Sequence, residues 1–337
     1  MNIFMTGATG YIGRLLAQKL AEQGHTIHAL CRSSSQTGDL QHPNIKFFEG
    51  DLLDSNSIDR AMASCQQAYH LAAFAKVFTK QPELHDHINV DGTMNVLAAA
   101  QKAGVQRTVF TSTGGVFGFS TPDQPVDEAT PRNIEFFNHY ERTKTEAEEK
   151  IRELAAQGQD IVIVNPTRVY GPGLLSESNA ATRLMQLYYQ GKWKMSPGDG
   201  TKLGNYVYVN DVVNGHILAM EKGRAGERYI IGGINASYKQ LFDTLGKHAP
   251  KKLKLMNAPV WLMMIVSNFE LAKAKLFNMK PLITPKYAKK YTYHWGLSSA
   301  KAEKELGYEI TSLDEGIRQT MEWLAALENN NAQAQNA

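Results

Sequence analysis

The chain has few cysteines, no long apolar run and almost no net charge. Its two cysteines, Cys31 and Cys65, form neither a CxxC pair nor a metal-ligand spacing, so we expect free thiols in a reducing cytoplasm and no disulfide framework. The longest apolar run covers residues 258–266, nine positions interrupted by Pro259, whereas a membrane-spanning helix needs about 20. The N-terminus shows no basic leader followed by a cleavable apolar stretch. These features predict a soluble, cytoplasmic protein with no integral membrane segment.

The charge balance argues against a nucleic-acid partner. In 337 residues, 36 lysines and arginines face 33 aspartates and glutamates, and no basic face concentrates the net charge of +3. The ten histidines offer no metal-ligand pattern, since His85 and His87 are two positions apart and would point to different sides of a helix. We therefore predict no metal site. A hydrophobic content of 43% is enough for a sizeable core in about two domain-sized units.

The first half of the chain alternates strand patterns with helix patterns. Strands are predicted at residues 2–6, 26–31, 45–48, 68–73, 107–112 and 160–165, and helices at 11–23, 55–64, 87–103 and 138–157. Alternation at this spacing is typical of α/β proteins in which helices cover both faces of a parallel sheet. We therefore predict a Rossmann-type doubly wound parallel sheet, accompanied by a smaller mixed α/β domain.

The domain boundary is predicted after the sixth strand, where the alternation becomes irregular. Residues 1–165 would form the sheet domain and residues 166–327 the smaller, substrate-binding domain, with some segments returning to the sheet domain. Residues 328–337 lack apolar side chains to bury and are predicted to be disordered. The apolar stretch 258–277 fits a substrate lid, a membrane-surface patch or a core helix, and its periodicity does not distinguish these three.

A glycine-rich turn joins the first predicted strand to the first helix. Gly7, Gly10 and Gly13 would let the backbone turn tightly and approach a pyrophosphate, and the helix that begins at Tyr11 and Ile12 would present free N–H groups to that anion. A glycine triplet alone is weak evidence. Its position at a strand-to-helix turn of an alternating α/β chain is the context that makes it a dinucleotide site.

Tyr140 and Lys144 lie four residues apart, on one face of a predicted helix. A nearby ammonium favours the phenolate, so Tyr140 would act as the acid–base partner of a carbonyl or alcohol oxygen. The chain holds a second such pair, Tyr188 and Lys192, which lies outside the nucleotide-binding half. The alternative for the first pair is a solvated helix face, because charged residues surround it.

These motifs resemble those of the extended branch of the short-chain dehydrogenase/reductase superfamily, in which the glycines are spaced Gly-x-x-Gly-x-x-Gly. The branch includes sugar-nucleotide epimerases, dihydroflavonol reductases and 3β-hydroxysteroid dehydrogenases. Thr113, three residues before Val116, matches the position of the Ser or Thr that holds the substrate oxygen, with Ser112 as the fallback. The resemblance further implies that Lys144 binds ribose hydroxyls and that the chain forms a homodimer.

The resemblance also implies further contacts with a nicotinamide cofactor. The strand 26–31 is followed by Arg32 and not by a carboxylate, so we predict NADP, with Arg32 on the 2′-phosphate, and keep NAD as the alternative. An ordinary surface arginine is the other interpretation of Arg32, and a helix cap that of Asp51. The remaining cofactor-binding residues that the resemblance implies, in chain order, are Asp51, Leu52, Leu71, Ala72, Ala73, Asn89, Pro166 and Val169.

The substrate class is predicted from one position that departs from the pattern of the nucleotide-sugar enzymes and from one segment that resembles another subgroup of the branch. Gly204 stands where nucleotide-sugar enzymes usually carry an arginine for the substrate diphosphate, and the loss of that bidentate partner argues against a nucleotide sugar unless another cation compensates. Residues 292–308 resemble the hydroxysteroid dehydrogenase and dihydroflavonol reductase subgroup. We predict an NADP-dependent oxidoreductase for a bulky apolar small molecule. The alternatives are a nucleotide-sugar epimerase or dehydratase and, from another class, a non-catalytic NADP-binding redox sensor.

Overall fold

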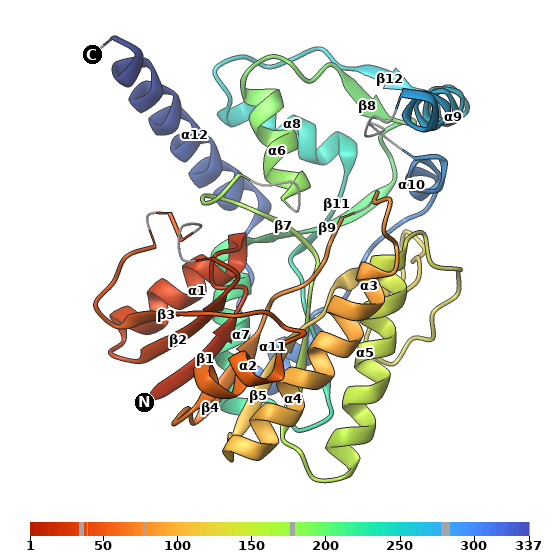
Figure 1. Cartoon of the computed structure of the whole chain (residues 1–337). Helices are drawn as coiled ribbons and strands as arrows, with labels where there is room; N and C mark the ends of the chain where they lie inside the picture. The colour runs from red at the N-terminus through yellow and green to blue at the C-terminus, as the bar shows by residue number, and fades with distance from the viewer. Residues whose placement is uncertain (34–36, 39, 77, 176–178, 278–283, 337) are drawn as a thin grey trace.

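Seven parallel strands form the central sheet of the molecule, in the order β10-β6-β5-β4-β1-β2-β3 (Figure 1). The computed structural model describes the chain except residues 34–36, 39, 77, 176–178, 278–283 and 337. The strands of this sheet are β1 (Asn2–Thr6), β2 (Thr26–Cys31), β3 (Ile45–Glu49), β4 (Gln67–His70), β5 (Arg107–Thr111), β6 (Ile161–Pro166) and β10 (Arg228–Ile231). Strand order reverses between β1 and β4, which is where a doubly wound sheet binds its ligand.

Helices cover both faces of this sheet, as the alternating pattern predicted. Buried side chains of α1 (Tyr11–Glu22), α7 (Val209–Lys222) and α11 (Ala300–Leu306) share one core cluster. Those of α2 (Ser55–Met62), α4 (Gly92–Ala103) and α5 (His139–Ala156) pack on the opposite face. The prediction of a Rossmann-type parallel sheet is confirmed.

The smaller domain lies above the carboxyl ends of the strands in Figure 1 and has its own core of aromatic and aliphatic residues. A three-stranded sheet joins it to the large one, and a two-stranded sheet lies at its far side. Its strands are β7 (Arg168–Tyr170), β8 (Met195–Pro197), β9 (Leu203–Tyr208), β11 (Ile234–Ser237) and β12 (Met256–Ala258). Its helices are α6 (Ala180–Tyr189), α8 (Tyr238–His248), α9 (Val260–Phe277), α10 (Pro285–Lys289), η4 (Lys290–Thr292) and α12 (Leu313–Asn336).

Several boundaries differ from the sequence prediction. The fourth strand ends at His70 and not at residue 73. The helix expected at 87–103 is divided into the π-turn η2 (His87–Asp91) and α4, and a short helix α3 (Leu84–Asp86) precedes it. α7, β10 and α11 lie after residue 166 yet pack with the large sheet. α12 continues to Asn336, whereas disorder was predicted from residue 328; its packed first part gives the helix a nucleus, and adding a residue to an existing helix is easy.

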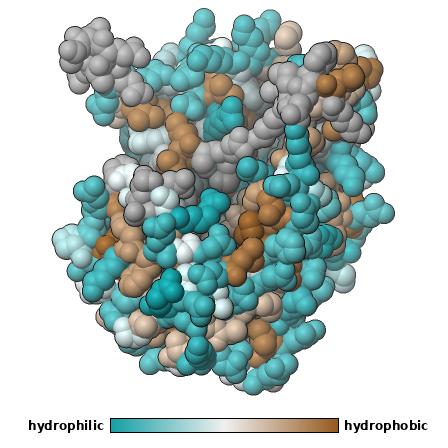
Figure 2. Space-filling view, in the orientation of Figure 1, coloured by the Kyte–Doolittle hydropathy of each residue, from teal (hydrophilic) through white to brown (hydrophobic). Residues whose placement is uncertain are grey.

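The helix α9 is not a core helix. Trp261, Ile265 and Phe269 are 65%, 59% and 68% exposed, so the core interpretation of residues 258–277 is wrong. Figure 2 shows apolar side chains at the surface in the region of α9, at the upper right of the view. In the described part of the chain, no helix is long and apolar enough to cross a membrane.

Candidate active site

The glycine turn fits closely against the end of β4. Gly7 has a φ of +74°, and a Cβ at this position would lie 2.7 Å from the backbone nitrogen of Ala72. A Cβ at Gly13 would lie 2.1 Å from the carbonyl oxygen of Gly7. Only glycine tolerates these two contacts, so the turn and the backbone of Leu71 and Ala72 form one continuous surface. Its residues therefore fit a dinucleotide.

The first turn of α1 keeps its N–H groups available for an anion. Gly10 is the N-cap and supplies no side chain to cap the helix, and no acidic residue lies in the first turn. The Tyr11 hydroxyl donates to the carbonyl of Gly171 at 2.9 Å, so this side chain is held by β7's neighbour in sequence, and the backbone of the turn is the part that would bind a pyrophosphate.

The buried side chain of His70 links the end of β1 to α4 beside the glycine turn. The His70 ring lies between the hydroxyls of Thr6 and Thr93, at 2.6 and 3.0 Å, and the Ala72 N–H donates to Thr6 Oγ1 at 3.1 Å. Burial lowers the pKa of His70 to about 3, so the ring stays neutral and holds this network at any physiological pH. The sequence analysis did not single out His70.

Tyr140 and Lys144 lie on the first turns of α5, on the same side of the helix. Asn138 caps α5 by accepting the N–H of Glu141 at 2.8 Å, which fixes where the helix begins. Lys144 is only 1% exposed, and its Nζ lies 3.9 Å from the centroid of the Phe110 ring on β5. The alternative of a solvated helix face is therefore wrong for Lys144.

Thr113 follows β5 and faces Tyr140. Its Oγ1 accepts the N–H of Gly115 at 3.1 Å, capping the short helix η3 (Gly114–Val116), and its hydroxyl also interacts with the Tyr140 phenol. Ser112, the fallback, is 4% exposed, and its Oγ has no hydrogen-bond partner among the described residues. Because Thr113 is the more exposed of the two and contacts Tyr140, it remains the candidate for holding the substrate oxygen.

Burial dominates the electrostatics of the tyrosine. Burial and, to a smaller extent, the charge of Glu141 raise the pKa of Tyr140 to about 12, against the Thr113 hydroxyl, which lowers it. Without a bound cofactor the phenol therefore holds its proton, whereas the sequence analysis expected Lys144 to favour the phenolate. A phenol in this state is a proton donor, and a cationic nicotinamide would favour its ionised form.

Beneath the lysine lies a carboxylate that the sequence analysis treated as part of a solvated face. Burial lowers the pKa of Lys144 to about 7, against the charge of Glu148, which raises it. Glu148 is fully buried, and its Oε1 accepts the Asn165 side-chain N–H at 2.6 Å. The same Asn165 nitrogen donates to the Thr113 carbonyl at 3.2 Å, which ties the α5 face to the residue expected to hold the substrate. The i, i+4 spacing of 140, 144 and 148 was the available sequence signal.

The other residues implied for the cofactor lie at or after the carboxyl ends of several strands of the large sheet, and their contacts with a cofactor remain predictions. Arg32 is exposed just after β2. Asp51 Oδ1 accepts the Leu53 N–H at 2.9 Å and so closes a turn, while Asp54 is the residue that caps α2. The Asn89 amide is bonded to both backbone groups of Phe74 and to Thr143, an arrangement that positions the loop after β4.

Leu52, Ala73, Pro166 and Val169 complete the implied set. Leu52, Ala73 and Val169 are half-buried, whereas Pro166 is buried at the end of β6. The carbonyl of Pro166 lies 3.4 Å from where a Cβ on Gly114 would be, so the segment after β6 passes beside the residue that follows Thr113. Among the described residues, no group of three or more metal-ligating side chains is present.

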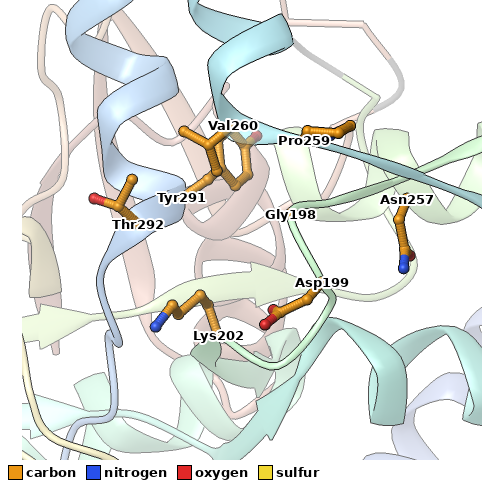
Figure 3. A pocket seen from close by; sticks show the side chains of 8 residues that line it. All are labelled: Gly198, Asp199, Lys202, Asn257, Pro259, Val260, Tyr291 and Thr292. Carbon is orange, nitrogen blue, oxygen red and sulfur yellow. The ribbon is translucent and has the colours of Figure 1, made fainter.

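A cavity of about 450 Å³ lies on the smaller domain, and the candidate catalytic residues Thr113, Tyr140 and Lys144 do not line it (Figure 3). Tyr291 and Thr292 lie on one side of it, Asp199 and Lys202 come from the loop before β9, and Pro259 and Val260 introduce α9. The apolar helix α9 therefore begins at the wall of this cavity.

Comparisons with known proteins agree with this site. The model of the "NAD dependent epimerase/dehydratase family" matches residues 3–232. The chain is 32% identical to a putative dihydroflavonol 4-reductase of Synechocystis, over 95% of this chain and 93% of that one, and 32% identical to sterol demethylase protein B of Methylococcus capsulatus, over 73% and 74%. The structure of UDP-glucose 4-epimerase from Thermotoga maritima, solved with UDP-glucose, superposes with a TM-score of 0.80 at 27% identity, over 97% and 99%.

The glycine turn, the Tyr–Lys pair and these matches together settle the family. The chain belongs to the NAD dependent epimerase/dehydratase family, the extended branch of the short-chain dehydrogenases/reductases, and is an NAD(P)-dependent enzyme that acts on CH–OH and carbonyl groups.

Proposed function

We propose that the enzyme is an NADPH-dependent reductase that interconverts a ketone or aldehyde and an alcohol on a bulky, largely apolar substrate. The observation that carries this proposal is the Tyr140 phenol, which keeps its proton beside the Thr113 hydroxyl. A carbonyl oxygen held between these two groups would receive a hydrogen bond from Thr113 and a proton from Tyr140. A bound reduced nicotinamide supplies the hydride to the carbonyl carbon.

The residues around the pair would assist in three ways. Lys144, when charged, would bind ribose hydroxyls and stabilise the Tyr140 phenolate after proton transfer. Glu148 favours the charged lysine from below. Asn165 holds the Thr113 carbonyl, which keeps the threonine in position while charge develops on the substrate oxygen.

Two features support the cofactor and the substrate class. Arg32 is exposed at the carboxyl end of β2 and is followed in sequence by three serines and not directly by a carboxylate, which suits a 2′-phosphate. The apolar start of α9 borders the cavity of the smaller domain, and two relatives are named for a dihydroflavonol and a sterol. A bulky ring system would suit this surface.

The test is NADPH consumption by the purified protein with ketosteroids, dihydroflavonols and simple aldehydes, with NADH in parallel. We expect NADPH oxidation with a bulky ketone. Arg32→Ala should reduce the preference for NADPH over NADH by about 10- to 100-fold, because a charge-assisted contact contributes about 1.5–3 kcal/mol. Conversion of a nucleotide sugar without net NADPH consumption would favour the epimerase alternative, and tight cofactor binding with no turnover would favour the sensor.

A further inference from the structure

Arg168, the first residue of β7, is enclosed by tyrosine rings. Its Nη1 donates to the hydroxyls of Tyr238 and Tyr206, at 2.9 and 3.3 Å. The centre of the guanidinium lies 5.7 and 5.5 Å from the centroids of the same two rings. The Tyr291 ring packs on Tyr238 at 5.8 Å and also lines the cavity of the smaller domain. The arginine therefore lies behind a wall of that cavity, deep in the chain but still partly exposed.

No carboxylate neutralises this guanidinium. In the part of the chain that the structure describes, Arg168 forms no ion pair, and its Nε and Nη2 form no hydrogen bond. Three other arginines of comparably low exposure, Arg107, Arg132 and Arg228, each have a carboxylate oxygen within 2.9–3.3 Å. An unpaired charge at such depth is costly, so natural proteins retain one where something else supplies the counter-charge.

The tyrosines do not supply that charge. Burial raises the pKa of Tyr206, Tyr238 and Tyr291 above its ordinary value, so all three stay neutral phenols. The hydroxyls of Tyr206 and Tyr238 accept hydrogen bonds from Nη1 and their rings stabilise the cation, but the net charge remains.

Two more cations lie nearby and share one carboxylate. Glu141 pairs with Lys290 and with Arg132, the latter at 3.2 Å. Burial lowers the pKa of Lys290, and the charges of Arg168 and Arg132 lower it further, while Glu141 opposes them. Three cations against one carboxylate leave an excess of two positive charges beside the helix turn that carries Tyr140.

Gly204 provides the room for this arrangement. A Cβ at Gly204 would lie 2.4 Å from Arg168 Nη1, so the guanidinium occupies the space that any side chain at 204 would need. Thr167, the preceding residue, has its Cγ2 3.2 Å from a Cβ position on Gly114, which follows Thr113. The cation missing at position 204 is thus present at position 168, next to the segment that crosses the catalytic residues.

We infer that Arg168 binds an oxyanion of the substrate, a carboxylate or a phosphate, through its free Nε and Nη2 edge. A planar guanidinium edge matches such an anion with two parallel hydrogen bonds. This inference rests on the proposed function, which supplies the bulky, apolar part of the substrate. It narrows the substrate class to amphiphilic molecules with a bulky ring system and one anionic group. A diphosphate of a nucleotide sugar offers the same oxyanion chemistry, so the experiment separates the two sources.

The experiment measures binding and not turnover. Dissociation constants are determined by calorimetry, with and without NADP⁺, for a 3-ketosteroid carboxylic acid, for its methyl ester and for UDP-glucose. The wild type should bind the acid about 10- to 100-fold more tightly than the ester, the range of a charge-assisted bidentate contact. Arg168→Gln should abolish that preference, and Arg168→Lys, which keeps the charge but not the planar edge, should retain part of it.

Two control variants and the melting temperature keep the test falsifiable. Arg183→Gln, an exposed arginine on α6, should bind both ligands like the wild type. Lys202→Gln removes a cation that lines the cavity itself, and loss of the preference there instead of at Arg168 would overturn the assignment. Arg168→Gln removes an unpaired charge but also the hydrogen bonds to Tyr206 and Tyr238, so its melting temperature is measured to show that the variant is folded. If it is not folded, Arg168→Lys decides the question: a preference for the acid equal to that of the wild type in this variant would overturn the inference.

The outcomes separate this inference from the proposed function. Arg168-dependent binding of the keto acid supports both. Arg168-dependent binding of UDP-glucose alone supports the oxyanion site and refutes the apolar reductase. Equal binding of acid and ester by a protein that reduces bulky ketones would refute the oxyanion site and leave the reductase intact.

Discussion

Two tyrosine–lysine pairs share the same spacing in this chain and have opposite surroundings. Tyr140 and Lys144 lie on α5 over the sheet, where the lysine is 1% exposed and the phenol meets the Thr113 hydroxyl. Tyr188 on α6 is buried in the smaller domain, where its hydroxyl accepts the Leu253 N–H at 3.1 Å, and Lys192 is exposed. The two pairs differ in that only the first combines a desolvated lysine with a tyrosine that contacts a second hydroxyl, so the spacing alone does not define a catalytic pair.

The largest expected effect separates the two tyrosines. Tyr140→Phe removes the proton donor, so kcat should fall by about 10²- to 10⁴-fold with the fold intact. Tyr188→Phe should leave kcat unchanged and lower the free energy of unfolding by about 1–3 kcal/mol, because the Leu253 N–H loses its acceptor. Steady-state kinetics and denaturant unfolding of both variants test this; full activity of Tyr140→Phe would remove the distinction between the pairs.

The two lysines should differ in stability as well as in activity. The pKa of Lys144 is lowered from 10.5 to about 7, so between these pH values the unfolded chain binds more protons than the folded one. The destabilisation that this lysine causes is therefore complete below about pH 7 and disappears as the pH rises towards about 10.5.

Lys144→Met should thus be more stable than the wild type at pH 6, by an amount on the order of a few kcal/mol that shrinks at pH 9.5, while activity is lost. Lys192→Met is the matched control and should change neither stability nor activity, since its side chain is in solvent. Urea unfolding at the two pH values measures the difference. A Lys144→Met variant less stable than the wild type at pH 6 would contradict the prediction.

The smallest expected effect concerns Glu148, the buried carboxylate next to Lys144. Glu148→Gln removes the charge that raises the pKa of Lys144, so this pKa should fall further and the ammonium should be lost at lower pH. The basic limb of the pH–rate profile should move down by up to about 1 pH unit, with a loss of rate of less than about 10-fold at neutral pH. Glu149→Gln, on the exposed side of α5, is the control and should leave the profile in place.

Much of the fold was predictable because it depends on local patterns. β1 (Asn2–Thr6) and β2 (Thr26–Cys31) have the predicted bounds, and α5 differs by one residue at each end. Apolar runs, glycine turns and helix caps each depend on residues that are neighbours in the sequence, so they can be recognised without the tertiary structure. The end of β4 at His70 was not predictable in this way, because its next residues turn away to pack against the backbone of Gly7.

The candidate site was predictable in part. Thr113, Tyr140 and Lys144 follow from motif and position, and the structure places Thr113 against Tyr140. The sequence alone did not point to Glu148 or Arg168 as candidates, although the spacing of Glu148 from Lys144 was visible. A glutamate surrounded by charged neighbours in sequence is usually in solvent, and only the packing of α5 on the sheet shows that this one is buried.

The sequence by itself determined the parallel sheet, the glycine turn and the Tyr–Lys pair, since each depends on residues within a few positions of one another. Only the tertiary structure shows which of the two Tyr–Lys pairs has a desolvated lysine. It also shows that α9 exposes apolar side chains and that the guanidinium of Arg168 fills the space left by Gly204. These outcomes depend on contacts between residues far apart in the chain, and burial, which sets their charge states, exists only once those contacts have formed.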